Sequence, residues 1–139
     1  MADTRTLSGV AQAVAVSALR AQQSRMRVIA ENLANSNSTA QTPGGDPYRR
    51  QTPIFEPVKI AGAQGVTMAG VEPDQTAFRV EHNPGHPAAD ADGYVKLPNV
   101  NSLVEALDMR EAQRAYEANL NVIETARAME MRTLDLLKR

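Results

Sequence analysis

The sequence has no cysteine and no tryptophan, and its 139 residues include only two phenylalanines and three tyrosines. Without cysteine, thiol nucleophiles, disulfide bonds and thiolate metal ligands are excluded. Because aromatic side chains contribute the largest buried areas, their scarcity leaves little material for a thick globular core. The sequence therefore predicts thin, alanine-rich packing in one domain or one elongated subunit.

The chain also lacks a large charge of one sign and a long hydrophobic run. Its formal net charge at pH 7 is −1, which gives no electrostatic footprint for binding nucleic acid or an anionic membrane. No run approaches the roughly 18 apolar residues of a membrane span, and the N-terminus lacks the features of a cleaved secretory signal. If the protein leaves the cytosol, we expect it to use another route.

Proline and glycine are concentrated in the middle of the chain, where residues 43–98 contain all eight prolines and seven of the eight glycines. Interior proline costs a helix about 3 kcal/mol and glycine about 1 kcal/mol, so long helices belong outside this region. We therefore predict two terminal helices, within residues 1–40 and 99–139, that pair as one core domain. Residues 41–98 are predicted to form a Pro/Gly-rich loop with short β-strands.

The N-terminal segment has apolar residues at helical spacing on two overlapping faces. The helix is expected to be about 30 residues and roughly 45 Å long, and to end in the polar run 35–39, whose side chains compete for backbone hydrogen bonds. One face contains Leu7, Val10, Val14, Ala18 and Ala21, and the other contains Leu19, Met26, Ile29 and Leu33.

The C-terminal segment opens with Ser102 and Glu105 at capping-box spacing, in which the serine hydroxyl and the glutamate carboxylate each accept from a free amide. The helix that follows is expected to be about 37 residues and roughly 55 Å long. Apolar and small residues recur at close to every seventh position, again on two faces. One face contains Met109, Ala112, Tyr116, Ile123, Ala126, Leu134 and Leu137, and the second contains Val104, Ala115, Ala118, Val122, Met129 and Leu136.

Two long helices with two apolar faces each create a packing problem, because pairing them buries one face and leaves the other in water. The predicted fold is therefore mainly α, with the terminal helices paired as a coiled coil and a small β-rich middle segment. We expect neighbouring copies or partners to cover the second faces, since few aromatic residues are available to do so. An isolated antiparallel hairpin or small bundle is the alternative.

Short β-favouring pieces in the middle segment predict a small hairpin or a three-stranded sheet. Pro53 and Pro57 restrict the first piece to an edge or broken strand, because proline cannot donate to a ladder. A sheet this small is expected to dock on the helices or on a neighbour, and residues 82–98 are expected to form a loop. The β-favouring pieces are residues 50–60, 65–71 and 76–81.

No set of residues predicts catalysis, cofactor binding or a metal site. His82, His86 and Asp90 have the spacing of metal ligands on a helix, but the prolines and glycine among them prevent that helix. A glycine-flanked serine of the nucleophile-elbow kind is absent. The glutamates of the C-terminal segment alternate with arginines, as on a solvated or intersubunit face.

A short basic group, Arg49 and Arg50 beside Tyr48, is too small for counterion-driven nucleic-acid binding. We expect either a charge contact with a neighbouring subunit or a simple exposed pair.

Four stretches of the sequence resemble one known family. NLAN in the first predicted helix, together with RAYEAN in the last, resembles the rod, hook and hook-junction proteins of the bacterial flagellum. GYVKLPNVN and the short length are similar, within that superfamily, to the FlgC family of basal-body rod proteins. The stretches are RMRVIAENLAN at residues 25–35, PYRRQ at 47–51, HPAADADGYVKLPNVN at 86–101 and QRAYEANLNVIETARAMEMRTLDLLKR at 113–139.

The resemblance implies a structural subunit, and no enzyme, in the proximal rod of the flagellar basal body, the driveshaft that crosses the periplasm. It implies export through the flagellar type III apparatus and helical assembly with other rod proteins, the rod-to-ring adaptor and the membrane ring. The alternative is a coiled-coil adaptor or chaperone module that binds a partner helix without polymerising. The predicted subunit interface contains Leu19, Met26, Ile29, Asn32, Leu33, Asn35, Tyr48, Arg49, Arg50, Arg114, Tyr116, Asn119, Ile123 and Leu134.

Overall fold

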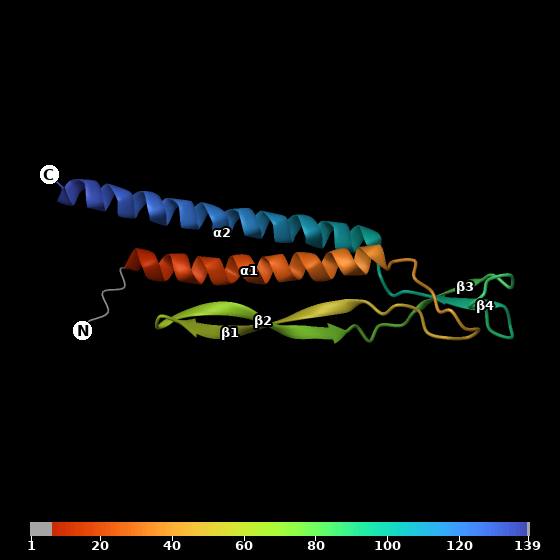
Figure 1. The fold of residues 1–139 in the computed structure, drawn as a ribbon. Helices are drawn as coiled ribbons and strands as arrows, with labels where there is room; N and C mark the ends of the chain where they lie inside the picture. The colour runs from red at the N-terminus through yellow and green to blue at the C-terminus, as the bar shows by residue number, and fades with distance from the viewer. Residues whose placement is uncertain (1–6, 139) are drawn as a thin grey trace. The chain divides into compact units, whose positions relative to one another are not determined.

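The computed structural model describes residues 7–138, which form two long helices and four strands (Figure 1). The strands make two separate two-stranded sheets, β1 with β2 and β3 with β4. The elements are α1 (Leu7–Ala34), β1 (Gln51–Ile60), β2 (Ala63–Pro73), β3 (Arg79–His82), β4 (Tyr94–Leu97) and α2 (Ser102–Leu137). The chain divides into two compact units: unit one contains the described residues up to 26, 54–70 and from 110 onward, and unit two contains residues 27–53 and 71–109.

Helix α1 ends where the polar run begins, as predicted. The amide of Asn35 still donates to the carbonyl of Glu31 at 3.1 Å, but the amide of Ser36 donates to Leu33, one residue closer along the chain. The hydroxyl of Ser38 then donates to Oδ1 of Asn35 at 3.0 Å. Short polar side chains therefore take over from the helical ladder.

Helix α2 begins at the predicted residue but with a different cap. Oδ1 of Asn101 accepts from the amides of Leu103 and Val104 at 3.1 and 3.4 Å, so asparagine is the N-cap. The predicted capping box of Ser102 and Glu105 is wrong. Asparagine caps a helix as well as serine does, and the carboxylate of Glu105 instead binds an arginine described below.

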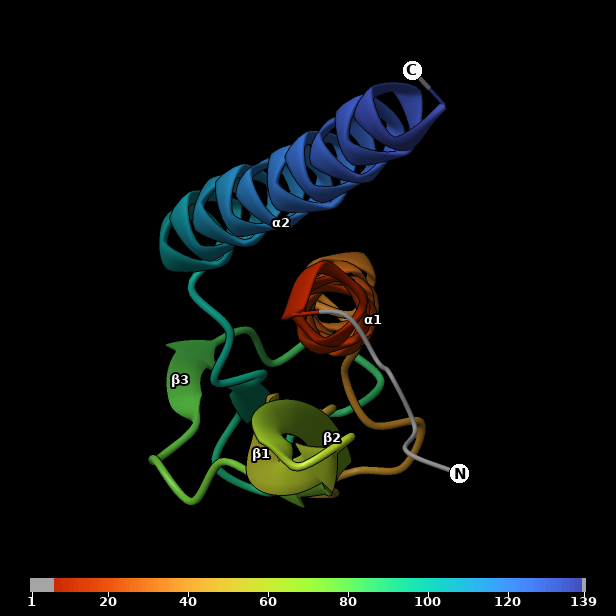
Figure 2. The same cartoon turned by 90° about the vertical axis from the view of Figure 1, so that its left-hand side faces the viewer.

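In unit one, α1 lies between α2 and the β1–β2 hairpin, as Figures 1 and 2 both show. The two helices run in opposite directions, because the hydroxyl of Ser8 donates to the carbonyl of Ala126 whereas Arg25 pairs with Glu111 at 3.5 Å. The predicted alanine-rich packing is confirmed in this unit. Its buried hydrophobic residues are Ala15, Ala21, Ala112 and Ala126. Coiled-coil packing of the two helices remains a prediction.

The hairpin approaches α1 closely because one strand residue is glycine. The amide of Val66 donates to Oγ of Ser17 at 3.3 Å, which joins the edge of β2 to the helix. A Cβ atom at Gly65 would lie 2.7 Å from that same Oγ and 2.6 Å from Cδ1 of Ile60. A side chain at position 65 would therefore force the side chains of Ile60 and Ser17, or the strand itself, to shift.

Strand β1 is an edge strand, as its prolines predicted. The backbone amide and carbonyl of Gln51 both bind the side chain of Asn32. These two backbone groups therefore point away from the partner strand β2. Alternate residues of a strand share one direction. Pro53 and Pro57 are in phase with Gln51, and their missing N–H groups therefore cost the ladder nothing.

Unit two contains the second sheet, in which β3 and β4 pair antiparallel from Arg79 opposite Leu97 to His82 opposite Tyr94. Of the two arrangements predicted for the middle segment, the small hairpin is found, as β1 with β2, and the three-stranded sheet is wrong. The loop expected over residues 82–98 is also wrong, because this range contains β4. Four residues are too short for a clear alternating pattern, although Val95 is buried and its two neighbours are exposed. The described hydrophobic core of this unit contains Val28, Ile29, Ala88, Val95 and Val100.

Candidate functional site: the exposed face of α2 and the Arg50 network

Helix α2 has one covered and one exposed apolar face, as the sequence predicted. On the first face, Ala112 and Ala126 are buried and Tyr116 and Ile123 are half-buried, whereas Leu134 and Leu137 at the C-terminal end of the same face are exposed. On the second face, the side chains become more exposed toward the C-terminus: Val122 is 47 %, Met129 60 % and Leu136 71 % exposed. We call Ala115, Ala118, Val122, Met129 and Leu136 the α2 stripe; all five belong to unit one.

Helix α1 does not keep a comparable second face. Among the predicted face residues in its described part, Leu19, Met26 and Leu33 are half-buried and Ile29 is buried, whereas only Leu7 is largely exposed. This face of α1 is therefore partly covered within its own chain. Whether neighbouring subunits cover the rest of it remains a prediction.

Asn32 ties the end of α1 to the start of β1 within unit two. Its side chain is 1 % exposed. Oδ1 accepts from the amide of Gln51 at 2.9 Å and from the hydroxyl of Tyr48 at 2.8 Å, and Nδ2 donates to the carbonyl of Gln51 at 2.8 Å. The NLAN and PYRRQ stretches are therefore physically joined, because one asparagine of the first holds the backbone of the second.

The hydroxyl of Tyr48 remains protonated and can act as this donor. Burial raises the pKa of Tyr48, and the negative charges of Glu31 and Glu105 raise it further. Each of these causes disfavours the phenolate.

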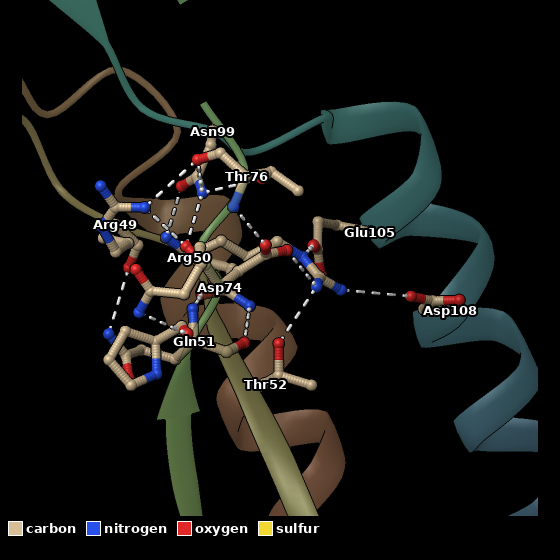
Figure 3. A network of polar contacts seen from close by, with 12 residues as sticks. Arg49, Arg50, Gln51, Thr52, Asp74, Thr76, Asn99, Glu105 and Asp108 are labelled. Carbon is tan, nitrogen blue, oxygen red and sulfur yellow. Dashed lines mark hydrogen bonds and ion pairs between the residues drawn. The ribbon is translucent and has the colours of Figure 1, made fainter. Parts of the chain in front are cut away.

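Arg50 is the centre of a network of carboxylates in unit two (Figure 3). Its Nε donates to Oε1 of Glu105, which is completely buried on the first turns of α2. Its guanidinium also pairs with Asp74 at 3.2 Å and Asp108 at 3.8 Å, and donates to Oγ1 of Thr52. One guanidinium thus joins its own segment to the segment at Asp74 and to the start of α2. An arginine suits this role better than a lysine would, because its planar group presents several N–H donors in fixed directions.

The charges in this network stabilise one another. Burial lowers the pKa of Arg50, but the hydrogen bonds and charges of Glu105 and Asp74 outweigh it, and the net shift is upward. The pKa of Asp74 is lowered, chiefly by the backbone hydrogen bond from Thr76 and then by its side-chain bonds to Thr76 and Arg50. Both groups are therefore charged at neutral pH.

Asn99 and Arg49 extend the network through backbone groups. Oδ1 of Asn99 accepts from the amide of Arg50 at 2.7 Å, and its Nδ2 donates to the carbonyls of Asp74 and Thr76. Arg49 donates to the same two carbonyls, and its guanidinium lies 4.1 Å from the ring centre of Phe78. The sequence analysis singled out the two arginines but not their partners.

Several residues of the predicted subunit interface are engaged inside the chain. Asn32, Tyr48 and Arg50 hold unit two together through the contacts above. Asn35 and Asn119 each donate to a carbonyl one turn earlier in their own helix. Arg114 and Leu134 are exposed, and the interface itself remains a prediction.

His86 and Asp90 make local hydrogen bonds to the backbone. Nδ1 of His86 accepts from the amide of Ala88, and Oδ1 of Asp90 accepts from the amides of Asp92 and Tyr94. Among residues 7–138, no three side chains are placed to hold a metal ion. No helix in this part of the chain is long and apolar enough to cross a membrane.

A buried polar network and an uncovered apolar helix face are features of a subunit built for assembly. Comparison with known proteins agrees. A family model described as "Flagella basal body rod protein" matches residues 13–40, and one described as "Flagellar basal body rod FlgEFG protein C-terminal" matches residues 91–136. These regions include α1 from residue 13 and most of α2.

Curated relatives cover nearly the whole chain. It is 48 % identical over 130 residues to "Flagellar basal-body rod protein FlgC" of Agrobacterium fabrum, covering 92 % of this chain and 94 % of the relative. It is 42 % identical to the protein of the same name from Salmonella typhimurium, over 88 % and 92 %. It is 40 % identical to that of Borreliella burgdorferi, over 90 % and 94 %. The chain belongs to the FlgC family of flagellar basal-body rod proteins.

Proposed function

We propose that the chain is a structural subunit of the proximal rod of the bacterial flagellar basal body, without catalytic activity. It polymerises through its terminal helices into the torque-transmitting driveshaft, which spans the periplasm. The observation that supports this role most directly is the α2 stripe. A chain that folds its middle segment along α1 but leaves α2 half uncovered needs a neighbour for α2.

The stripe can supply a useful free energy of association. Fully burying a side chain such as valine, leucine or methionine is worth about 1.5–3 kcal/mol. Val122, Met129 and Leu136 are each roughly half to two-thirds exposed, so covering them contributes about 3–5 kcal/mol per subunit by the same area scale. Repeated at every subunit, a term of this size favours a polymer without requiring a tight dimer.

The Arg50 network contributes rigidity rather than association. Its ion pairs hold the start of α2, the start of β1 and the segment at Asp74 in one arrangement within unit two. A subunit that transmits torque needs such fixed internal geometry. Family membership further supports, as partners, the other rod proteins, the rod-to-ring adaptor and the membrane ring, with the type III apparatus as the export route.

The stripe can be tested with two methionines on α2. Met129 lies on the stripe, whereas Met131 is 66 % exposed and is rotated about 200° around the helix from Met129. In cells that lack the native gene, Met129→Asp should abolish swimming and yield no complete basal bodies, because it places a charge on the α2 stripe, which a neighbouring subunit would bury. Met131→Asp is the matched control and should retain most motility. Full motility with Met129→Asp would reject the proposal.

A further inference from the structure

A pocket lies at the start of α2, inside unit two. Its volume is about 430 Å³, and it is lined by residues of the segment that leads into β3, by Arg79 of that strand, and by residues 99–103 at the start of α2. All of these residues belong to unit two. The backbone of Arg79 is held in place, because β3 pairs with β4 at this point, opposite Leu97. The pocket therefore presents its cation from a paired strand.

Arg79 is the only charged residue in the lining of the pocket, and it has no acidic partner in the part of the chain that the structure describes. Glu81 follows two residues later on the same face of β3 but does not pair with it. Asp74 and Glu105 are bound to the central arginine of the polar network. The two asparagines of the lining already bind backbone groups. What the pocket lacks is an acid.

An exposed apolar surface continues from the pocket along α2. Leu103, which lines the pocket, is 70 % exposed, and Leu107, one turn later on the same side of the helix, is 57 % exposed. Ala106 lies beside them and is also exposed. Leu107 is rotated about 140° around the helix from Ala112, which is buried, so this side of α2 faces away from the covered side. We call Arg79, Leu103, Ala106 and Leu107 the α2-start patch.

The chemistry of the patch defines what fits it. A carboxylate is the natural partner of a guanidinium, because two parallel N–H···O bonds match the two groups. A small anion would neutralise Arg79 but leave the two leucines in water, and a purely apolar segment would cover the arginine without pairing its charge. The occupant that satisfies both parts is a protein segment with an acidic side chain beside a large apolar one.

We infer that the α2-start patch binds a neighbouring subunit of the assembled rod, which places a carboxylate against Arg79 and a large apolar side chain on Leu103 and Leu107. The inference rests on the proposed function, because it concerns the subunit inside the rod. The patch and its occupant are complementary rather than identical, and contacts between unlike surfaces are the kind that build open helical filaments. The α2 stripe lies in unit one, so each unit contributes its own contact surface.

Charge reversal in cells that lack the native gene tests the acidic partner. Arg79→Glu should reduce the diameter of the swimming ring at least about twofold, because it sets two like charges against each other. Arg79→Lys keeps the charge and should swim. Lys59→Glu is the matched control, an exposed cation on β1 in unit one, and should swim like the wild type. Wild-type swimming with Arg79→Glu, at the wild-type protein level on an immunoblot, would overturn the inference.

Photo-cross-linking tests the contact without altering any charge. A photoreactive amino acid in place of Leu103 or, if that variant does not swim, of Ala106 is activated in motile cells. The adduct should join two rod subunits, and mass spectrometry should place the attachment site within about four residues of an aspartate or glutamate. No adduct with a rod subunit, or an attachment site without a nearby acid, would reject this inference alone.

The wild-type chain in the same cells separates the two proposals. If it does not restore swimming, the proposed function fails, and this inference fails with it. If it restores swimming while the cross-linker at the α2-start patch captures no rod subunit, the proposed function stands and only the contact is wrong.

Discussion

Removing the guanidinium of Arg50 is expected to destabilise the chain more than loss of an ordinary surface charge. In Arg50→Met, the methionine fills much of the same volume, but Glu105 is left completely buried and without its cation. Breaking a buried ion pair from one side costs about 3–5 kcal/mol, because an uncompensated charge remains in the interior. The Arg50 side chain is 22 % exposed, so water screens part of this cost, and we expect about 3 kcal/mol.

The paired variant separates an uncompensated charge from lost packing. Arg50→Met combined with Glu105→Leu removes both charges, and its free energy of unfolding should fall by less than about 1.5 kcal/mol, since apolar replacement of a whole buried pair is often neutral. The double variant should therefore be more stable than Arg50→Met alone.

Urea unfolding of the purified full-length chain, followed by circular dichroism at neutral pH, measures both effects. A loss below about 1 kcal/mol in Arg50→Met would place it among ordinary surface substitutions. That result, or a double variant less stable than the single one, would refute the account of Arg50 as the cation that compensates Glu105.

Three further changes test other contacts. Because the pKa of Asp74 is lowered in the folded chain, its stabilising contribution is present above the unfolded pKa and is lost as pH falls below about 4; Asp74→Asn should flatten this part of the stability–pH curve measured by urea unfolding. Gly65→Ala should cost about 1–3 kcal/mol through its clash with Ser17, whereas Gly70→Ala, with no atom within 4 Å of its added Cβ, should change the thermal midpoint little. Asn32→Asp removes the donor to the carbonyl of Gln51 and buries a charge, so it should lower the midpoint strongly, while the same change at half-buried Asn35 should have a small effect.

Sequence reasoning located the helices because their causes are local. The confinement of proline and glycine to residues 43–98 left only the terminal segments free for long helices, and α1 and α2 lie there. The seven-residue recurrence in the last segment identified two apolar faces of α2, and the structure showed which of them is partly buried. The edge position of β1 followed from Pro53 and Pro57, since a missing N–H group is a property of the residue itself.

Long-range partners could not be found this way. Asn101 rather than Ser102 caps α2, because Glu105 is drawn to an arginine 55 residues earlier in the chain. Four residues of alternating pattern were too few to reveal β4. Asn32 was assigned to a subunit interface on its motif, yet it is buried against Gln51.

The sequence by itself determined which segments are helical, which residues share a face, and that the two helices carry more apolar surface than one pairing between them buries. These properties depend on spacing and on backbone chemistry, which each residue brings with it. Only the tertiary structure decided that α1 lies between α2 and the β1–β2 hairpin in unit one, and that the polar groups of Asn32, Tyr48 and Arg50 find their partners inside unit two. Such pairings arise between residues distant in the chain, because a buried donor or charge binds whichever complementary group the fold places within reach.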